Sequence, residues 1–152
     1  MRGWKMRVRV DFKKLTETAR IPTRATVGSA GYDLYVDTDK NSMVRPGETE
    51  WFSSGIAVEI PPGYVGLIYS RSGLSTKQGL RLANCVGVID SDYRGEIGLP
   101  IHNDSDEIQL IRAHERVAQL ILHPVCEIDF IEQDNLSETD RGTGGFGSTG
   151  RM

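Results

Sequence analysis

The stretch WFSSGIAVEIPPGYVGLIY (residues 51–69) places two apolar runs, 51–60 and 64–69, on either side of a Pro-Pro-Gly turn. Both runs are rich in β-branched and aromatic residues, which favour strands. Strand-like runs recur at 8–12, 117–122 and 125–131, the last two separated by His123 and Pro124. Residues 87–103 are predicted to form a hairpin that turns near 91–95. These patterns predict a chain built mainly from short strands.

Only SGLSTKQGLRLA (72–83) suggests a helix, and Gly79 interrupts it. Strands and helices do not alternate, which argues against a parallel α/β sheet. Many short strands joined by Gly and Pro turns are typical of a sandwich, jelly roll or barrel. We therefore predict an all-β fold with one short helix.

The chain has 152 residues, enough for one domain. Its net charge of −3 argues against general binding to nucleic acid or to a membrane surface. No apolar run approaches the length of a membrane span, and none follows the basic N-terminus MRGWKMRVRV. We expect a cytoplasmic protein whose Cys85 and Cys126 are reduced and buried.

The composition changes at about residue 137, where apolar residues become rare and glycine dominates. We therefore divide the chain into a core (1–136) and a flexible C-terminal arm (137–152). The arm contains RGTGGFGSTG (141–150), which includes the G-x-G-x-x-G spacing of a dinucleotide-binding turn. Such a turn requires a strand before it and a helix after it, so we reject that interpretation.

Four further stretches carry polar residues in otherwise β-like surroundings. They are AGYDLY (30–35) with Asp33, SRSGLS (70–75), GVIDSDYRGEIGLP (87–100) with Asp90, and RVAQLIL (116–122) with Gln119. In SRSGLS, a guanidinium beside backbone N–H groups at a helix start predicts an anion site. Each stretch also has an ordinary structural explanation: a turn carboxylate, a helix-capping serine or an outward-facing amide.

Taken together and in order, these five stretches resemble the five motifs of the trimeric dUTPases, over residues 30–150. One departure is Tyr69–Ser70, where many members have a proline next to the arginine. The resemblance implies a distorted jelly-roll or β-clip-like barrel assembled into a homotrimer. Each active site would combine the first, second and fourth motifs of one subunit with the third motif of another. The arm of the third subunit would complete it.

The same resemblance implies hydrolysis of dUTP to dUMP and pyrophosphate. This reaction limits uracil incorporation into DNA and supplies dUMP for dTMP synthesis. Asp90 matches the aspartate that orients and activates the attacking water. Mg²⁺ is expected on the triphosphate, held by phosphate oxygens and waters, with no direct protein ligand and with Asp33 acting through water.

The remaining residues that the resemblance assigns would bind parts of the substrate. Arg71, Ser72, Gly73 and Gln119 would hold phosphates, and the arm residues Arg141, Gly147, Ser148 and Thr149 would reach the terminal phosphate. Asn84 and the backbone near Gly98 would read uracil, bordered by Val88 and Ile89. Tyr93 would pack under the sugar, and Phe146 would stack on the base.

Two alternatives stay open from the sequence. The related dCTP deaminases share the fold but need a catalytic glutamate at the position that we align with Pro100, which has no acid–base group. A regulatory binding protein is the other alternative, because some phage members of the superfamily bind repressors. Every expected catalytic position is filled, so an enzyme is favoured.

Overall fold

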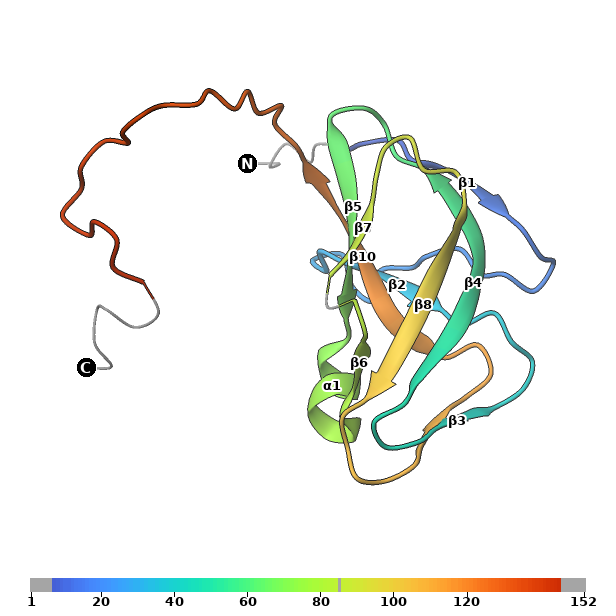
Figure 1. Ribbon diagram of the computed structural model, residues 1–152. Helices are drawn as coiled ribbons and strands as arrows, with labels where there is room; N and C mark the ends of the chain where they lie inside the picture. The colour runs from blue at the N-terminus through green and yellow to red at the C-terminus, as the bar shows by residue number, and fades with distance from the viewer. Residues whose placement is uncertain (1–6, 85, 146–152) are drawn as a thin grey trace.

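The computed structural model describes residues 7–84 and 86–145 (Figure 1). Its elements are β1 (Asp11–Lys14), β2 (Tyr32–Tyr35), β3 (Ser42–Val44), β4 (Thr49–Glu59), β5 (Tyr64–Ser70), α1 (Ser72–Gln78), β6 (Leu80–Leu82), β7 (Gly87–Ile89), β8 (Glu96–Asn103), β9 (Gln109–Ile111) and β10 (Arg116–Pro124). The prediction of a mainly β chain with one short helix is confirmed.

Two four-stranded antiparallel sheets form the body, in the orders β1-β4-β8-β6 and β2-β10-β5-β7, and β3 pairs with β9 in a small third sheet. The Pro-Pro-Gly turn between β4 and β5 carries the chain from the first sheet to the second. The arrangement is jelly-roll-like, but the sheets stay open and do not close into a barrel.

The core lies between the two sheets and follows the alternation of each strand. On β8, Ile97, Leu99 and Ile101 are at most 1% exposed, while Gly98 and Pro100 lie on the opposite face of the sheet, where Pro100 is also buried. Leu34 on β2 and Ile56 on β4 are equally buried. Each such side chain contributes roughly 1.5–3 kcal/mol through burial, so this core holds the two sheets in a fixed relation.

The predicted helix 72–83 is too long, because α1 ends at Gln78. Gly79 adopts φ 66° and its N–H donates to the carbonyl of Leu74, which terminates the helix. The chain then enters β6, whose Leu80 and Leu82 are buried and pair with β8. Burial of two alternating leucines against the sheet outweighs the helical propensity of this segment.

The predicted hairpin at 87–103 is wrong. β7 pairs with β5 in one sheet, whereas β8 pairs with β4 and β6 in the other. Residues 90–95 therefore connect the sheets. β8 lies inside the first sheet and buries its alternating apolar residues in the core, whereas β7 is an edge strand of the second sheet.

Predictions near the chain ends need corrections as well. β10 runs through His123 to Pro124, and no strand forms at 125–131, where Ile128 and Phe130 are 69% and 92% exposed because no strand within residues 7–84 and 86–145 lies beside them. The N-terminal strand begins at Asp11, after Val8 and Val10. Cys126 is exposed and not buried as predicted, while Cys85 lies outside the described residues.

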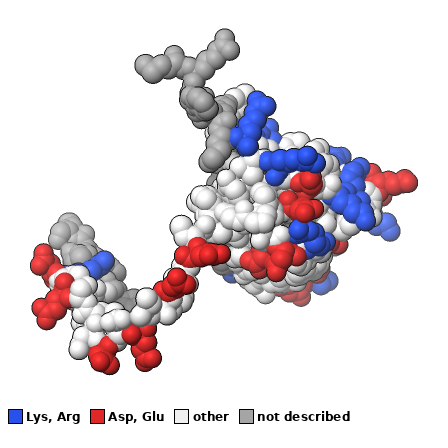
Figure 2. Space-filling model, turned by 90° about the horizontal axis from the view of Figure 1, so that it is seen from above, with Lys and Arg blue, Asp and Glu red and all other residues white. Residues whose placement is uncertain are grey.

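The segment after β10 extends away from the body (Figure 1). Carboxylates lie along it, whereas the visible face of the body carries both carboxylates and groups of lysines and arginines (Figure 2). The described residues 137–145 are almost all exposed, as are residues 123–136 before them. No helix in the described part of the chain is long and apolar enough to cross a membrane.

Candidate active site

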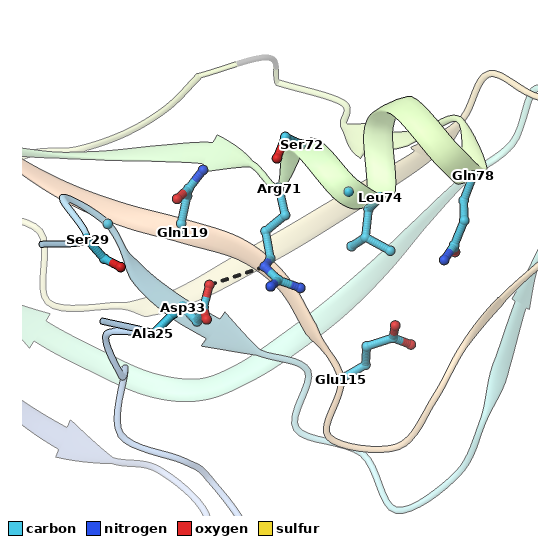
Figure 3. Close-up of a pocket in the computed structure, with 11 residues that line it drawn as sticks. Ala25, Ser29, Asp33, Arg71, Ser72, Leu74, Gln78, Glu115 and Gln119 are labelled. Atoms are coloured by element: carbon cyan, nitrogen blue, oxygen red, sulfur yellow. Dashed lines mark ion pairs between the residues drawn. The ribbon is translucent and has the colours of Figure 1, made fainter. Parts of the chain in front are cut away.

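A cavity of about 340 Å³ opens where β2, β10 and the start of α1 meet (Figure 3). Strand register creates it: Gln119 on β10 lies opposite Asp33 on β2 and opposite Tyr69 on β5. The chain turns into α1 directly after β5, which brings Arg71 and Ser72 to the same place. The first, second and fourth sequence motifs therefore share one cavity within a single chain.

Asp33 lies between two arginines at the base of this cavity. Its Oδ1 is 3.2 Å from Nε of Arg71, and its Oδ2 accepts a hydrogen bond of 3.0 Å from Nη1 of Arg116. Arg71 also donates to the carbonyl of Arg116 at 3.0 Å. The Asp33 side chain is only 10% exposed, so these charge-assisted contacts are strong. They fix the Arg71 guanidinium before any substrate arrives.

Ser72 and Gly73 begin α1, and both line the cavity. The carbonyl of Arg71 accepts from the N–H groups of Leu74 and Ser75, both at 3.1 Å. The N–H groups of Ser72 and Gly73, the first two helical residues, have no acceptor within the helix. A side chain added at Gly73 would meet no atom within 4 Å. This surface is open, and it presents N–H donors suited to phosphate oxygens.

Gln119 is held in place by a glycine that the sequence analysis did not single out. Its Nε2 donates to the carbonyl of Ser70 at 3.1 Å. A Cβ at Gly31 would lie 2.6 Å from Oε1 of Gln119, so only glycine permits this close approach. Gly31 precedes Tyr32 inside AGYDLY. Glycine is needed there because β2 pairs with β10, and a single sequence does not show that pairing.

Other cavity residues were also missed: Ala25, Ser29, Leu74, Gln78 and Glu115 line it. Ala25 and Ser29 belong to a loop braced by Arg24, whose Nε donates to the Ser29 carbonyl at 2.8 Å. The Arg24 guanidinium also lies 5.7 Å from the ring centroid of Tyr32. Nothing in the loop's composition distinguishes it from an ordinary surface turn. Arg116, which binds Asp33, was missed as well. Its position directly before the apolar run of β10 is the one sequence feature that could have pointed to it.

Backbone N–H and carbonyl groups form a second polar site at the edge of β8. The carbonyl of Pro100 accepts from the N–H of Ala83, just past β6. Backbone groups of alternate residues on a strand point to the same side, so the N–H and carbonyl of Gly98 point the same way, beyond the end of β6. Asn84 lies beside this open edge, with Nδ2 3.2 Å from where a Cβ on Gly87 would be. The edge offers an adjacent donor and acceptor.

The third motif does not reach the cavity within one chain. Ile89 pairs with Gly66, five residues before Arg71, which is roughly 17 Å at about 3.3 Å per residue. Val88 lies in the same strand, and Asp90 follows it at an exposed position. Tyr93 donates through its N–H to the Asp90 carbonyl at 3.2 Å and through its hydroxyl to the Glu96 carbonyl at 2.9 Å. The aspartate is thus presented on an ordered turn, away from the cavity.

The arm also lies apart from the cavity. Arg141 is exposed and its carbonyl accepts from the N–H of Gly144 at 3.0 Å, a purely local turn. The predicted arm residues Phe146, Gly147, Ser148 and Thr149 lie outside the described residues.

The residues that line the cavity suit a metal ion coordinated by the substrate's phosphates better than one coordinated directly by protein side chains. Across residues 7–84 and 86–145, no three His, Cys, Asp or Glu side chains come together as a ligand set. Both oxygens of Asp33 already face arginines, so direct coordination would break two ion pairs. Mg²⁺ keeps several waters and binds through phosphates in many sites, and a contact to Asp33 through water preserves those pairs.

In this all-β protein, Arg71, Gln119 and the first N–H groups of α1 surround one cavity, an arrangement typical of proteins that bind phosphate groups. The family comparison makes the class specific: the dUTPase family model matches residues 17–150, and this chain belongs to the dUTPase family. Curated relatives named deoxyuridine 5'-triphosphate nucleotidohydrolase agree. The protein from Desulfitobacterium hafniense is 42% identical over 95% of this chain and 97% of its own. That from Finegoldia magna is 47% identical over 86% and 91%.

Solved structures support the same family. A mutant dUTPase of Staphylococcus bacteriophage 80alpha with dUpNHpp has a TM-score of 0.84 and 30% identity, over 93% of this chain and 98% of that one. A mutant dUTPase from phage phi11 of S. aureus, described with a structural Mg(II) ion, has a TM-score of 0.73 and 28% identity, over 84% and 98%. The jelly-roll-like fold is therefore shared with dUTPases.

Proposed function

We propose that this chain is a dUTP diphosphatase, which hydrolyses dUTP to dUMP and pyrophosphate by attack of water on the α-phosphorus. The observation that carries the proposal is the convergence of Asp33, Arg71 and Gln119 on one cavity in a chain of the dUTPase family. The cavity supplies a guanidinium, an amide and N–H donors for the triphosphate. In such chemistry catalysis depends on positioning and on neutralising charge.

The active site is shared between subunits of a homotrimer. Asp90 lies roughly 17 Å along the sheet from the cavity by strand register, too far to activate a water that attacks a phosphate held by Arg71. A second copy of the chain brings its own Asp90 turn to the cavity. Its carboxylate accepts a proton from the attacking water and orients it in line with the leaving pyrophosphate.

Mg²⁺ is the proposed cofactor, and when bound it neutralises triphosphate charge. Asp33 would contact the metal through water molecules. The phosphate oxygens are held by Arg71, Ser72, Gly73 and Gln119. The N–H and carbonyl of Gly98, with Asn84, read the edge of uracil, and Val88 and Ile89 also contact the substrate. Tyr93 packs under the deoxyribose, where a 2′-hydroxyl would not fit.

Residues 137–152 act as the arm that closes a site on a neighbouring subunit. Arg141, Gly147, Ser148 and Thr149 bind the terminal phosphate, and Phe146 covers the base. We further infer that the enzyme works in the cytoplasm, because an exposed free thiol such as that of Cys126 is kept reduced inside the cell.

The two alternatives are disfavoured by specific observations. A dCTP deaminase would need an acid–base residue where Pro100 stands, and Pro100 is buried with its carbonyl bonded to Ala83. A purely regulatory protein would not need the Asp33, Arg71 and Arg116 ion pairs that prepare the cavity for an anion.

Mixing two inactive variants tests the shared site. Arg71→Ala destroys the cavity of its own subunit, and Asp90→Asn removes the water-activating carboxylate. Each protein alone should release almost no pyrophosphate from dUTP with Mg²⁺. Refolded together, the chains form some sites with an intact Arg71 from one subunit and an intact Asp90 from another, roughly a quarter of all sites by random assortment.

Recovery of activity on mixing supports the shared site, and its absence in a mixture shown to contain mixed trimers refutes it. A mixture of Asp90→Asn with Asp90→Gln is the matched control and should stay inactive. Assays of the unmodified enzyme with UTP, dTTP and dCTP should show little turnover. Release of ammonia from dCTP would overturn the hydrolase assignment itself.

A further inference from the structure

We propose that Trp51 forms one wall of the base-binding site and contacts the face of the pyrimidine. The inference rests on the base site at Gly98 proposed above. Trp51 is a large aromatic side chain on β4 that is 72% exposed. None of the five sequence motifs includes it.

The register of β4 and β8 places the indole directly over Gly98. Trp51 lies opposite Pro100, and Ser53 lies opposite Gly98. A Cβ built on Gly98 would be 2.0 Å from Cζ2, 2.7 Å from Cε2 and 2.9 Å from Cη2 of Trp51. All three atoms belong to the six-membered ring, so the indole crosses β8 diagonally and its outer edge covers Gly98. Glycine at position 98 is what allows the indole to reach so far.

A base bound at Gly98 would lie beside this ring. The N–H and carbonyl of Gly98 point toward the edge that β6 leaves open, so a ligand there occupies the place of the next strand, about 4.8 Å beyond β8. The indole comes from β4 on the other side and lies above β8, with its outer edge directed to the same opening. A planar ring in the plane of the sheet would therefore present its face to the edge of Trp51. Such edge-to-face contacts between aromatic rings are favourable.

The surroundings of Trp51 favour a small ligand over a protein partner. Along β4, Ser53 bonds to the Glu96 carboxylate on one side and Thr49 bonds to Nδ1 of His102 at 2.9 Å on the other. The indole thus has polar neighbours along its own strand, while the apolar Pro100 lies opposite it on β8. The cores of protein–protein interfaces are depleted in charged residues, whereas nucleobase sites combine isolated aromatic rings with backbone groups.

Tryptophan fluorescence tests the contact directly. Trp4→Phe leaves Trp51 as the sole tryptophan. This full-length variant should show a change in emission on titration with dUMP, and with dUpNHpp and Mg²⁺. Pyrophosphate, which has no base, should bind without changing the emission. Calorimetry on the same samples reports binding independently of the fluorophore.

Kinetics separate a base contact from a structural role. Trp51→Leu should raise KM for dUTP about two- to tenfold, since an edge-to-face aromatic contact is worth about 0.5–1.5 kcal/mol, and change kcat much less. Trp51→Phe should restore most of the affinity. Phe12→Leu, which removes an exposed aromatic from the neighbouring strand β1, is the matched control and should leave KM unchanged.

Two results would overturn the inference while leaving the proposed function intact. One is calorimetric binding of dUMP without any change in Trp51 emission. The other is dissociation of the trimer by Trp51→Leu in sedimentation, with the KM effect abolished at protein concentrations that restore the trimer. A third result concerns the base site itself. If the unmodified enzyme hydrolyses dUTP but the NMR signals of Asn84 and Gly98 do not shift when dUMP binds, the base does not bind at Gly98, and the proposed role of Trp51 is wrong as well.

Discussion

The carboxylate of Asp33 bridges two arginines: its Oδ1 is 3.2 Å from Nε of Arg71 (Figure 3), and its Oδ2 is 3.0 Å from Nη1 of Arg116. These residues come from β2, from the residue before α1 and from the start of β10. The bridge therefore joins three separate segments and orients the guanidinium of Arg71, which lines the cavity. A positioned cation avoids the entropic cost of ordering a long side chain when the substrate binds.

Asp33→Asn should lower kcat/KM for dUTP by about ten- to a hundredfold, because hydrogen bonds to charged groups contribute about 1.5–3 kcal/mol. Asparagine keeps the shape but leaves two guanidinium groups near each other without a counter-charge. Steady-state kinetics over a range of Mg²⁺ concentrations would measure the loss. Asp11→Asn, which removes a carboxylate from an exposed pair with Arg9, is the control and should have no effect. Equal losses in both variants would contradict the proposed role of the bridge.

Asp90→Asn should abolish turnover without preventing binding of the substrate. Asp90 is exposed at the end of β7 and lines no part of the cavity, so the phosphate-binding residues stay in place. Loss of a positioned general base typically costs about 10²–10⁴-fold in rate. Single-turnover hydrolysis and calorimetry with dUpNHpp would measure the two effects separately. A kcat within a few-fold of the unmodified enzyme would remove Asp90 from the mechanism.

Local pattern in the sequence predicted much of the fold but not the pairing of distant strands. The apolar runs on either side of the Pro-Pro-Gly turn are β4 and β5, as expected. The alternation in 125–131 also resembles a strand, yet a strand needs a partner, and the part of the chain that the structure describes provides none there. The hairpin error has the same origin, because β7 and β8 are consecutive but pair in different sheets.

The candidate site shows the same division. Asp33, Arg71, Ser72 and Gln119 were identified in sequence, and the structure brings them together. Gly31 was not, because its role is to admit the side chain of Gln119 from a strand far along the chain. Trp51 and Gly98 depend on register in the same way, since neither residue type predicts that one covers the other.

Gly55→Ala should destabilise the fold by roughly 2–4 kcal/mol, from backbone strain and overpacking together. Gly55 has φ 66°, and an added Cβ would lie 2.4 Å from Oδ2 of Asp37 and 2.7 Å from Cβ of Ala19. Gly47 is the matched control, because its φ is 73° but an added Cβ meets nothing within 4 Å. The difference in unfolding midpoint between the two alanine variants measures the packing part. Equal midpoints would show that only the backbone matters.

Deletion of residues 141–152 should leave a folded trimer with little activity. The described part of this segment is almost wholly exposed, and its backbone hydrogen bonds stay within the arm, so its removal costs the core nothing. The lost phosphate contacts of Arg141 and the arm's hydroxyls should lower kcat/KM by about a hundredfold or more at roughly 1.5–3 kcal/mol per charged contact. Sedimentation and thermal unfolding would confirm the trimer, and removal of residues 151–152 alone is the control. Full activity in the longer deletion would mean that the arm does not close the active site.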